Sequence, residues 1–236
     1  MGWKIILHAL RTLFRNHIVA FWLAMPMLLV LLLNTVLSAP DRGLEDVFNV
    51  LMLVGFVVAL GWAAVGWLRF VLLEEPTSTA GIAVRLVSVW RFLLRLAVVG
   101  FALSVLATFL GFILLVSMMV PEADTVVTVL VNIGFTVLTW LFLRISPFLT
   151  AAGLGQRMGV TQAWEVTKPY AKTLSIVAVM YFGLLWLLPK LTEAIFGGLP
   201  FLWEPVEIAM TCFNALLGIS LLTVIHGVCV DGREID

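Results

Sequence analysis

Residues 96–119 read LAVVGFALSVLATFLGFILLVSMM, an apolar run without a charged side chain. A helix needs ~20 mainly apolar residues to cross a bilayer, so this run is long enough to cross once. A membrane-spanning β-strand would instead show ~10 residues of alternating polarity, which this run lacks. The run therefore predicts a transmembrane helix.

Further runs of the same kind occur on both sides of this one. They lie at 18–38, 48–68, 125–145, 173–189 and 206–226. The 236 residues are 62% hydrophobic and 12% charged, whereas soluble domains are roughly 45–50% apolar and 25% charged. We therefore predict an all-α integral membrane protein, with six transmembrane helices in a single domain, residues 1–236. The first run, which follows three basic residues, is interpreted as an uncleaved signal-anchor.

The charged residues divide unequally between the two sides that six helices define. The 14 Lys and Arg balance the 14 Asp and Glu, giving a formal net charge of +0. All the Lys and Arg residues except Arg42 and Lys190 fall on the side of the two termini. Because basic loops stay in the cytoplasm, the N- and C-termini are both expected there.

Pairs of basic residues at i, i+4 precede three of the apolar runs, at intervals close to a third of the chain. These pairs are Arg11 and Arg15, Arg91 and Arg95, and Lys168 and Lys172. A proline at the far end of the run follows each pair, at Pro40, Pro121 and Pro189. We interpret the chain as three repeat units, approximately 1–80, 81–157 and 158–236. Each unit would be a hairpin of two transmembrane helices preceded by a basic amphipathic interfacial helix.

The segments around Trp3, Trp90 and Trp164 have the spacing of amphipathic helices. In the third, Pro169 is expected to kink or restart the helix. Together these three basic segments, which we call the basic collar, could bind anionic lipid headgroups, or they could serve only to fix topology and helix depth. The candidate lipid-binding or anion-binding residues are Arg11, Arg15, Arg69, Arg91, Arg95, Arg144, Lys168 and Lys172.

Three stretches carry a family resemblance: WLRFVLLE at 67–74, RISPF at 144–148 and GVTQAWEVT at 159–167. They resemble uncharacterised six-span bacterial inner-membrane proteins over roughly residues 60–190. The arrangement is also similar to the membrane domain attached to some glycerophosphodiester phosphodiesterases, although no catalytic phosphodiesterase portion is expected here. The resemblance implies this topology and a bacterial inner (cytoplasmic) membrane, and it implies no activity.

The apolar runs contain amides and hydroxyls near their middle but no carboxylate there. The missing carboxylates argue against a proton-coupled or sodium-coupled pump. Asn132, Asn214 and Thr139 are the intramembrane polar candidates. They could form hydrogen bonds between helices or line a polar substrate site.

Small residues recur at four-residue spacing in two of the runs. These stripes are Gly55, Ala59 and Ala63, and Gly100, Ser104 and Thr108. Such stripes let helix backbones approach closely, either within the chain or against another subunit.

The sequence lacks the local motifs of a metal site or a catalytic site. Cys212 and Cys229 would lie about 25 Å apart on one helix, too far to form a disulfide. CxxC and HExxH patterns are absent. We therefore expect no enzyme activity, metal or cofactor, although contact of His17 or His226 with a haem or pigment stays open.

These observations favour a non-enzymatic accessory, scaffolding or assembly component of the membrane. Its expected partners are another integral membrane protein and anionic membrane lipids, and no nucleic acid. The alternative is a carrier or channel for a small or amphiphilic molecule. A water-filled cavity lined by Asn132, Asn214 and Thr139 would favour transport, whereas a filled core with exposed small-residue or aromatic patches would favour a partner.

Overall fold

The computed structural model describes residues 2–37, 45–75, 82–117 and 124–234. Within these ranges the chain is helical and contains no strand. The helices in chain order are α1 (Gly2–Arg15), α2 (His17–Leu37), α3 (Glu45–Leu72), α4 (Ile82–Ser117), α5 (Asp124–Gly153), α6 (Val160–Val166), the 3₁₀ helix η1 (Lys168–Tyr170), α7 (Ala171–Phe196) and α8 (Pro200–Cys229).

Six of these helices, α2, α3, α4, α5, α7 and α8, are long and apolar enough to cross a membrane. This confirms the predicted fold class of an all-α protein with six membrane-spanning helices. Each of these helices covers one of the predicted runs within the described residues and extends beyond it at one or both ends. For example, α3 continues past residue 68 to Leu72, and α8 begins at Pro200 instead of residue 206.

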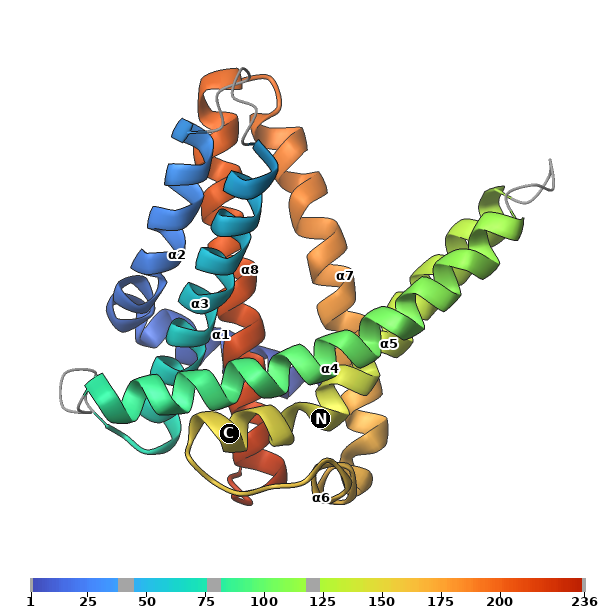
Figure 1. Cartoon of the computed structure of the whole chain (residues 1–236). Coiled ribbons are helices and arrows are strands. Elements are labelled where there is room, and N and C mark those ends of the chain that lie inside the picture. The colour runs from blue at the N-terminus through green and yellow to red at the C-terminus, as the bar shows by residue number, and fades with distance from the viewer. Residues whose placement is uncertain (1, 38–44, 76–81, 118–123, 235–236) are drawn as a thin grey trace.

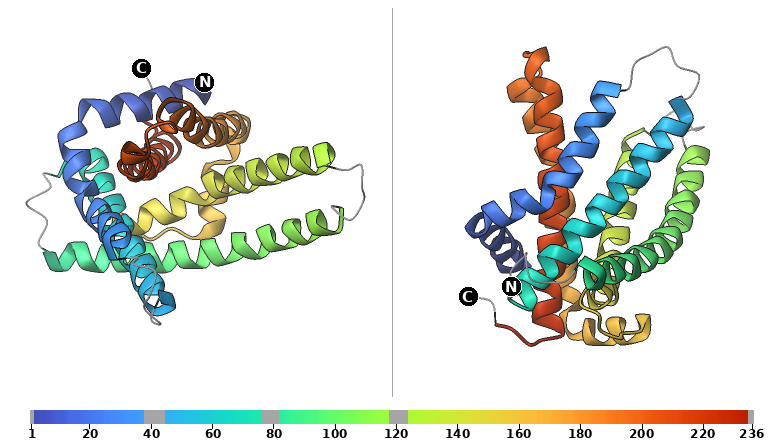
Figure 2. Two further views of the ribbon diagram at one scale, coloured as in Figure 1. Left: turned by 90° about the horizontal axis from the view of Figure 1, so that it is seen from above. Right: turned by 60° about the vertical axis from the view of Figure 1, so that its left-hand side comes forward.

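The molecule has two distinct ends. The basic end holds α1, α6, the start of α4 and the last residues of α8, and the acidic end holds the turn between α7 and α8 (Figure 1). Helices α2, α3, α7 and α8 stand together, whereas α4 crosses the base and leans outward together with α5 (Figure 1). Helix α8 is central and packs against α1, α2, α3, α5 and α7. Seen from above, α1 and α4 lie on opposite sides of α8 (Figure 2).

Close packing is concentrated in the half of the bundle near the basic end. On α8 every residue from Ile219 to Val228 is buried, whereas Glu204, Glu207 and Thr211 are exposed. The other long helices follow the same trend, with buried side chains near the basic end and exposed apolar ones near the acidic end. We call these the packed half and the open half.

Small residues explain the close approach of helices in the packed half. Ala59 and Ala63 of α3 are buried, and a Cβ added at Gly55 would lie 3.6 Å from Val30 of α2. This first small-residue stripe therefore packs inside the chain. The second stripe differs, because Gly100, Ser104 and Thr108 of α4 are all exposed. Small side chains bring backbones together where lipid supplies no hydrophobic drive.

The three basic segments take three different forms. The first is the separate helix α1, which Asn16 alone divides from α2. The second is continuous with the membrane-spanning part of α4, so the predicted separate helix is not observed there. No proline lies between Ile82 and Ser117, and nothing else in that stretch interrupts the backbone hydrogen bonds.

The third basic segment is divided at Pro169, as predicted. Helix α6 ends at Val166, and Pro169 lies within the 3₁₀ helix η1 that leads into α7. Pro189 marks the far end of its run, but it lies inside α7, which continues to Phe196. Pro40 and Pro121 lie outside the described residues. The threefold repeat stays a prediction.

Candidate membrane-interface site at the basic end

Helix α1 lies across the bundle at its basic end and packs against α7 and α8. Its inward face consists of small and aliphatic side chains that are almost completely buried. These are Ile5, Ile6, Ala9 and Leu13. Ser220 of α8 donates its hydroxyl to the backbone oxygen of Ala9 at 2.9 Å, which attaches the middle of α1 to the central helix.

The outward face of α1 combines apolar side chains with cations. Trp3 and Phe14 are 54% and 63% exposed, and Lys4, Arg11 and Arg15 are exposed beside them. The apolar side chains of α1 are therefore divided, because Ile6 and Leu13 are buried while Trp3, Leu7 and Phe14 are exposed. Aromatic and cationic side chains on one exposed face are typical of helices that lie in the membrane interface.

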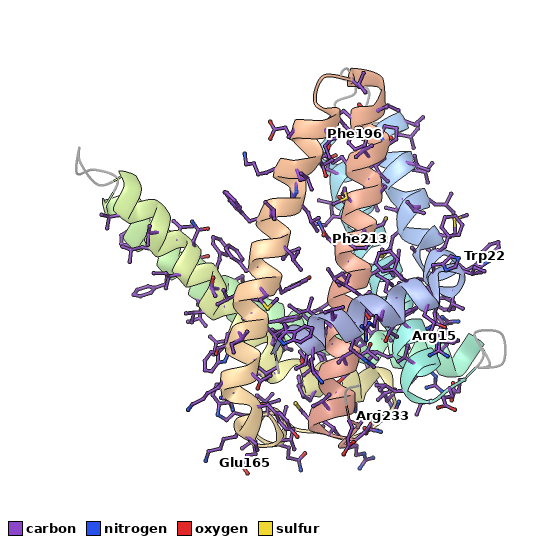
Figure 3. The ribbon with its side chains drawn as sticks, turned by 180° about the vertical axis from the view of Figure 1, so that it is seen from behind. Arg15, Trp22, Glu165, Phe196, Phe213 and Arg233 are labelled. Atoms are coloured by element: carbon purple, nitrogen blue, oxygen red, sulfur yellow. The ribbon has the colours of Figure 1, made fainter. Side chains whose placement is uncertain are left out.

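The junction of α1 and α2 continues this exposed surface. Arg15 and Trp22 both lie on this part of the molecule in Figure 3, and Trp22 is 67% exposed. The ring of Phe14 lies 6.3 Å from that of Phe213, which links the end of α1 to α8. The His17 side chain hydrogen-bonds to the backbone oxygen of Phe14 at 3.0 Å, so the turn between the two helices is fixed locally.

The other two basic segments also expose tryptophan and cations. On α4, Trp90 is 62% exposed next to the exposed Arg91. Near α6, Trp164 is 36% exposed, and Lys168 and Lys172 are exposed at the start of the following helices. Each of the three basic segments therefore exposes a tryptophan.

Five of the eight predicted lipid-binding residues are exposed, and the structure gives none of them an ion pair within the described ranges. These five are Arg11, Arg15, Arg91, Lys168 and Lys172. Their charges are therefore available to an anionic group at the membrane surface.

The other three predicted cations are engaged inside the protein. Arg69 forms a bidentate ion pair with Glu75, with Nε and Nη2 each 2.9 Å from a carboxylate oxygen. This pair closes the turn after α3, in which Glu74 has a left-handed φ of 54°. A non-glycine residue in that region is strained, so the ion pair holds the chain in a costly turn.

Arg144 attaches α6 to α5. Its guanidinium lies 3.7 Å from the ring centre of Trp164, and Nη2 donates to the backbone oxygen of the same residue at 2.8 Å. Thr167 donates its hydroxyl to the backbone oxygen of Arg144 at 3.1 Å. Arg144 is only 4% exposed, so these contacts replace solvent around its charge.

Arg95 and Arg85 of α4 make comparable contacts with neighbouring helices. The Arg95 guanidinium lies 4.3 Å from the ring centre of Phe148 on α5 and donates to the backbone oxygen of that residue. Arg85 lies 4.1 Å from the Trp62 ring of α3 and is 7% exposed. A Cβ at Gly66 would overlap the Arg85 guanidinium, so a larger residue there would force this side chain to move.

A buried hydrogen bond also joins α5 and α8. The Thr150 hydroxyl lies 2.6 Å from Nδ1 of His226, and both residues are 0% exposed. Nε2 of His226 is buried without a hydrogen-bond partner. His226 is the last residue of its apolar run, and nothing in the sequence pairs it with Thr150, because the two residues come from separate helices.

The intramembrane polar candidates do not share an environment. Thr139 donates its hydroxyl to the backbone of its own helix, at the Phe135 oxygen, 2.8 Å away. Asn132 lies toward the acidic end of α5, which diverges from α8 in Figure 1, whereas Asn214 lies on α8. The amide oxygen of Asn214 is buried without a hydrogen-bond partner.

The remaining candidates for a chemical role among the described residues are metal-binding groups and cysteines. Within them, no group of three or more His, Cys, Asp and Glu side chains could hold a metal ion. Cys212 and Cys229 are both free, on the same helix α8, in agreement with the expectation that they do not bridge. No protein-family model, curated protein or solved structure matches this chain.

Proposed function

We propose that the chain is a non-enzymatic component of a bacterial inner membrane that binds anionic lipid headgroups at its basic end. In this proposal it acts as an accessory or assembly factor for another integral membrane protein. The exposed cations of α1 and of the α6–α7 junction bind the headgroups, with both termini in the cytoplasm.

The observation that carries this proposal is the two-sided character of α1. One face is fixed to α8 through buried aliphatic side chains and the Ser220 hydrogen bond. The opposite face presents Trp3, Arg11 and Arg15 toward the surroundings. A helix held at this depth places its cations among headgroups, where each is worth ~1 kcal/mol of attraction to an anionic surface.

The arginines inside the protein support the proposal that the exposed cations are the ones that bind headgroups. Arg85, Arg95 and Arg144 lie against aromatic rings of neighbouring helices, so they hold the basic end together. The exposed cations make no such contacts and are not needed to close the bundle. This division leaves a rigid base that displays surplus positive charge.

The packing of α8 favours a partner-binding role over transport. The centre of the packed half is filled by buried side chains such as Leu217, Leu221 and Ile225. Large aromatic side chains, including Phe101 and Phe112 of α4, are exposed on the open half. A filled core with exposed aromatic surface suits a component that contacts another membrane protein.

Native mass spectrometry of the purified chain in mild detergent tests the headgroup proposal. Phosphatidylglycerol and phosphatidylcholine are added in parallel to the wild type and to the double variant Arg11→Gln with Arg15→Gln. Removing two charges at ~1 kcal/mol each should lower phosphatidylglycerol retention about tenfold or more and leave phosphatidylcholine retention unchanged.

Lys190→Gln is the matched control, because Lys190 is a 63% exposed cation on the part of α7 nearest the acidic end. It should retain phosphatidylglycerol as the wild type does. Equal retention of phosphatidylglycerol by the wild type and the α1 double variant would refute the headgroup site. The partner proposal has its own readout, which is an integral membrane protein that co-purifies from native membranes in constant ratio.

A further inference from the structure

The three basic pairs at i, i+4 differ in how their side chains are engaged. Arg11 and Arg15 of α1 are both exposed, and within the described ranges neither guanidinium has an ion pair or a hydrogen bond. In the pair on α4, Arg95 instead contacts the ring and the backbone oxygen of Phe148. The third pair consists of two lysines. In the part of the chain that the structure describes, α1 is thus the one segment whose pair offers two uncommitted arginines.

The spacing of this arginine pair is fixed by the helix that carries it. Arg11 and Arg15 are four residues apart on α1, so they stand on one face, about 6 Å apart along the helix axis. The opposite face is attached to the bundle, because Ala9 and Leu13 are buried and the Ser220 hydroxyl donates to the backbone oxygen of Ala9. A ligand that spans both arginines therefore meets them already in position.

The guanidinium group determines which anion suits the pair. Each guanidinium can bind two oxygens of a phosphate with two parallel N–H groups, whereas a lysine is a point charge. Two guanidinium groups used in this way need four oxygens. One phosphodiester has two non-bridging oxygens and a phosphate monoester has three, whereas two phosphodiesters joined by a short linker have four. The pair therefore matches a headgroup with two phosphates better than one with a single phosphate.

The surface next to the arginine pair is that of a membrane lipid site. Phe14 and Ile18 are each 63% exposed, and Trp22 is 67% exposed on the same part of the molecule as Arg15 (Figure 3). These apolar side chains can contact the acyl chains of a lipid whose headgroup is at α1. The first 40 residues contain no Asp or Glu, so no carboxylate of α1 or α2 competes for the two arginines.

We propose that Arg11 and Arg15 together bind one lipid headgroup with two phosphates, one phosphate at each guanidinium. A lipid of this class is cardiolipin, in which one glycerol joins two phosphodiesters. The inference rests on the proposed function, because it names the class of headgroup for the α1 part of the basic end.

Native mass spectrometry of the purified chain in mild detergent tests the inference. Cardiolipin, phosphatidylglycerol, phosphatidic acid and phosphatidylcholine are added one at a time at equal concentration. The wild type should retain cardiolipin about fivefold more than phosphatidylglycerol, since one further contact between a cation and a phosphate is worth ~1 kcal/mol. Phosphatidic acid carries its charge on a single phosphate and should be retained less than cardiolipin.

Two variants separate the arginine pair from the total charge of the basic end. Arg15→Gln leaves one guanidinium, so the ratio of cardiolipin to phosphatidylglycerol retention should fall to about one. Lys168→Gln with Lys172→Gln removes two exposed charges elsewhere at the basic end and should keep the fivefold ratio. An unchanged ratio in Arg15→Gln, an equal fall in the lysine variant, or equal retention of phosphatidic acid and cardiolipin would overturn the inference.

The outcomes also distinguish this inference from the proposed function. If the wild type retains cardiolipin and phosphatidylglycerol equally, and both more than phosphatidylcholine, the two-phosphate site is refuted and the headgroup proposal stands. If it retains neither more than phosphatidylcholine, both proposals are refuted.

Discussion

The packed half and the open half of the same helices differ in how far their side chains are buried and in which partners their polar groups contact. In the packed half, Ile225 and Ala63 are 0% exposed, and arginines near the basic end make contacts across helices. In the open half, hydroxyls such as Thr108 and Thr211 donate to their own helix, and apolar side chains are exposed. Lipid is as apolar as leucine, so nothing drives the open half to close.

This contrast separates the residues that hold the fold from those that meet the bilayer. Helices in a membrane associate where small side chains and hydrogen bonds bring them together. Both are present near the basic end, where α8 contacts five other helices. The same substitution should therefore cost stability in one half and almost none in the other.

The largest expected effect is that of Gly66→Ala. A Cβ at this position would overlap the Arg85 guanidinium and lie 2.6 Å from Leu23 Cδ2, so the ends of both buried side chains would have to move. We expect a loss of about 3 kcal/mol in the free energy of unfolding, measured by steric trapping in bilayers.

The matched substitution in the open half is Gly183→Ala on α7. A Cβ at Gly183 would meet no atom within 4 Å. This variant should be as stable as the wild type or gain about 0.5 kcal/mol, because alanine favours the helix over glycine. A similar loss in both variants would contradict the division into two halves.

A smaller effect is expected for Ile225→Ala in the centre of α8. Ile225 is 0% exposed, and its truncation leaves a cavity that the neighbours can fill only in part. We expect a loss of about 2 kcal/mol, in the same unfolding assay. Leu191→Ala on α7, at a position 51% exposed, should cost less than about 0.5 kcal/mol.

Thr150→Val tests the buried hydrogen bond between α5 and α8. The valine keeps the shape of threonine but removes the 2.6 Å contact to His226 Nδ1, so that neither ring nitrogen has a hydrogen-bond partner. We expect a loss of about 1 kcal/mol in thermal unfolding, near the range of intramembrane hydrogen bonds. The control is Thr139→Val, because the Thr139 hydroxyl donates to the Phe135 oxygen of its own helix, and this variant should be as stable as the wild type. Equal losses of stability in the two variants would show that the bond between Thr150 and His226 does not stabilise the fold.

The smallest effect is expected for Arg233→Ala at the end of the chain. Arg233 donates to the backbone oxygen of Leu72 at 2.8 Å and so caps the last turn of α3. Its removal should cost about 0.5 kcal/mol and speed amide hydrogen exchange at residues 70–73. Glu234→Ala serves as control, and unchanged exchange in Arg233→Ala would show that the cap is not needed.

Hydropathy alone was enough to predict the six long helices, because a run such as 96–119 has only one stable form in lipid. Pro169 likewise predicted the break before α7, since proline cannot donate the backbone bond. The sequence missed the continuity of α4, because a basic amphipathic segment looks the same whether or not it joins the next helix.

The sequence predicted which residues make up the candidate site, but not which of them are exposed and which contact neighbouring helices. Charge spacing placed Arg15 and Arg144 in the same collar, yet one is exposed and the other stacks on Trp164. Similarly, Arg85 meets Trp62 only because α3 and α4 pack together. Such pairings depend on tertiary contacts between distant segments, which local spacing does not encode.

Spin-label accessibility along α8 tests the central claim, that the bundle is packed at its basic end and open at its acidic end. Single nitroxides are placed at successive positions of α8 in a bilayer, after Cys212 and Cys229 are replaced by alanine. Collision with oxygen should be high with helical periodicity over 204–211 and low at every position over 219–228. Equal periodic accessibility along the whole helix, or protection of 204–211, would contradict the claim.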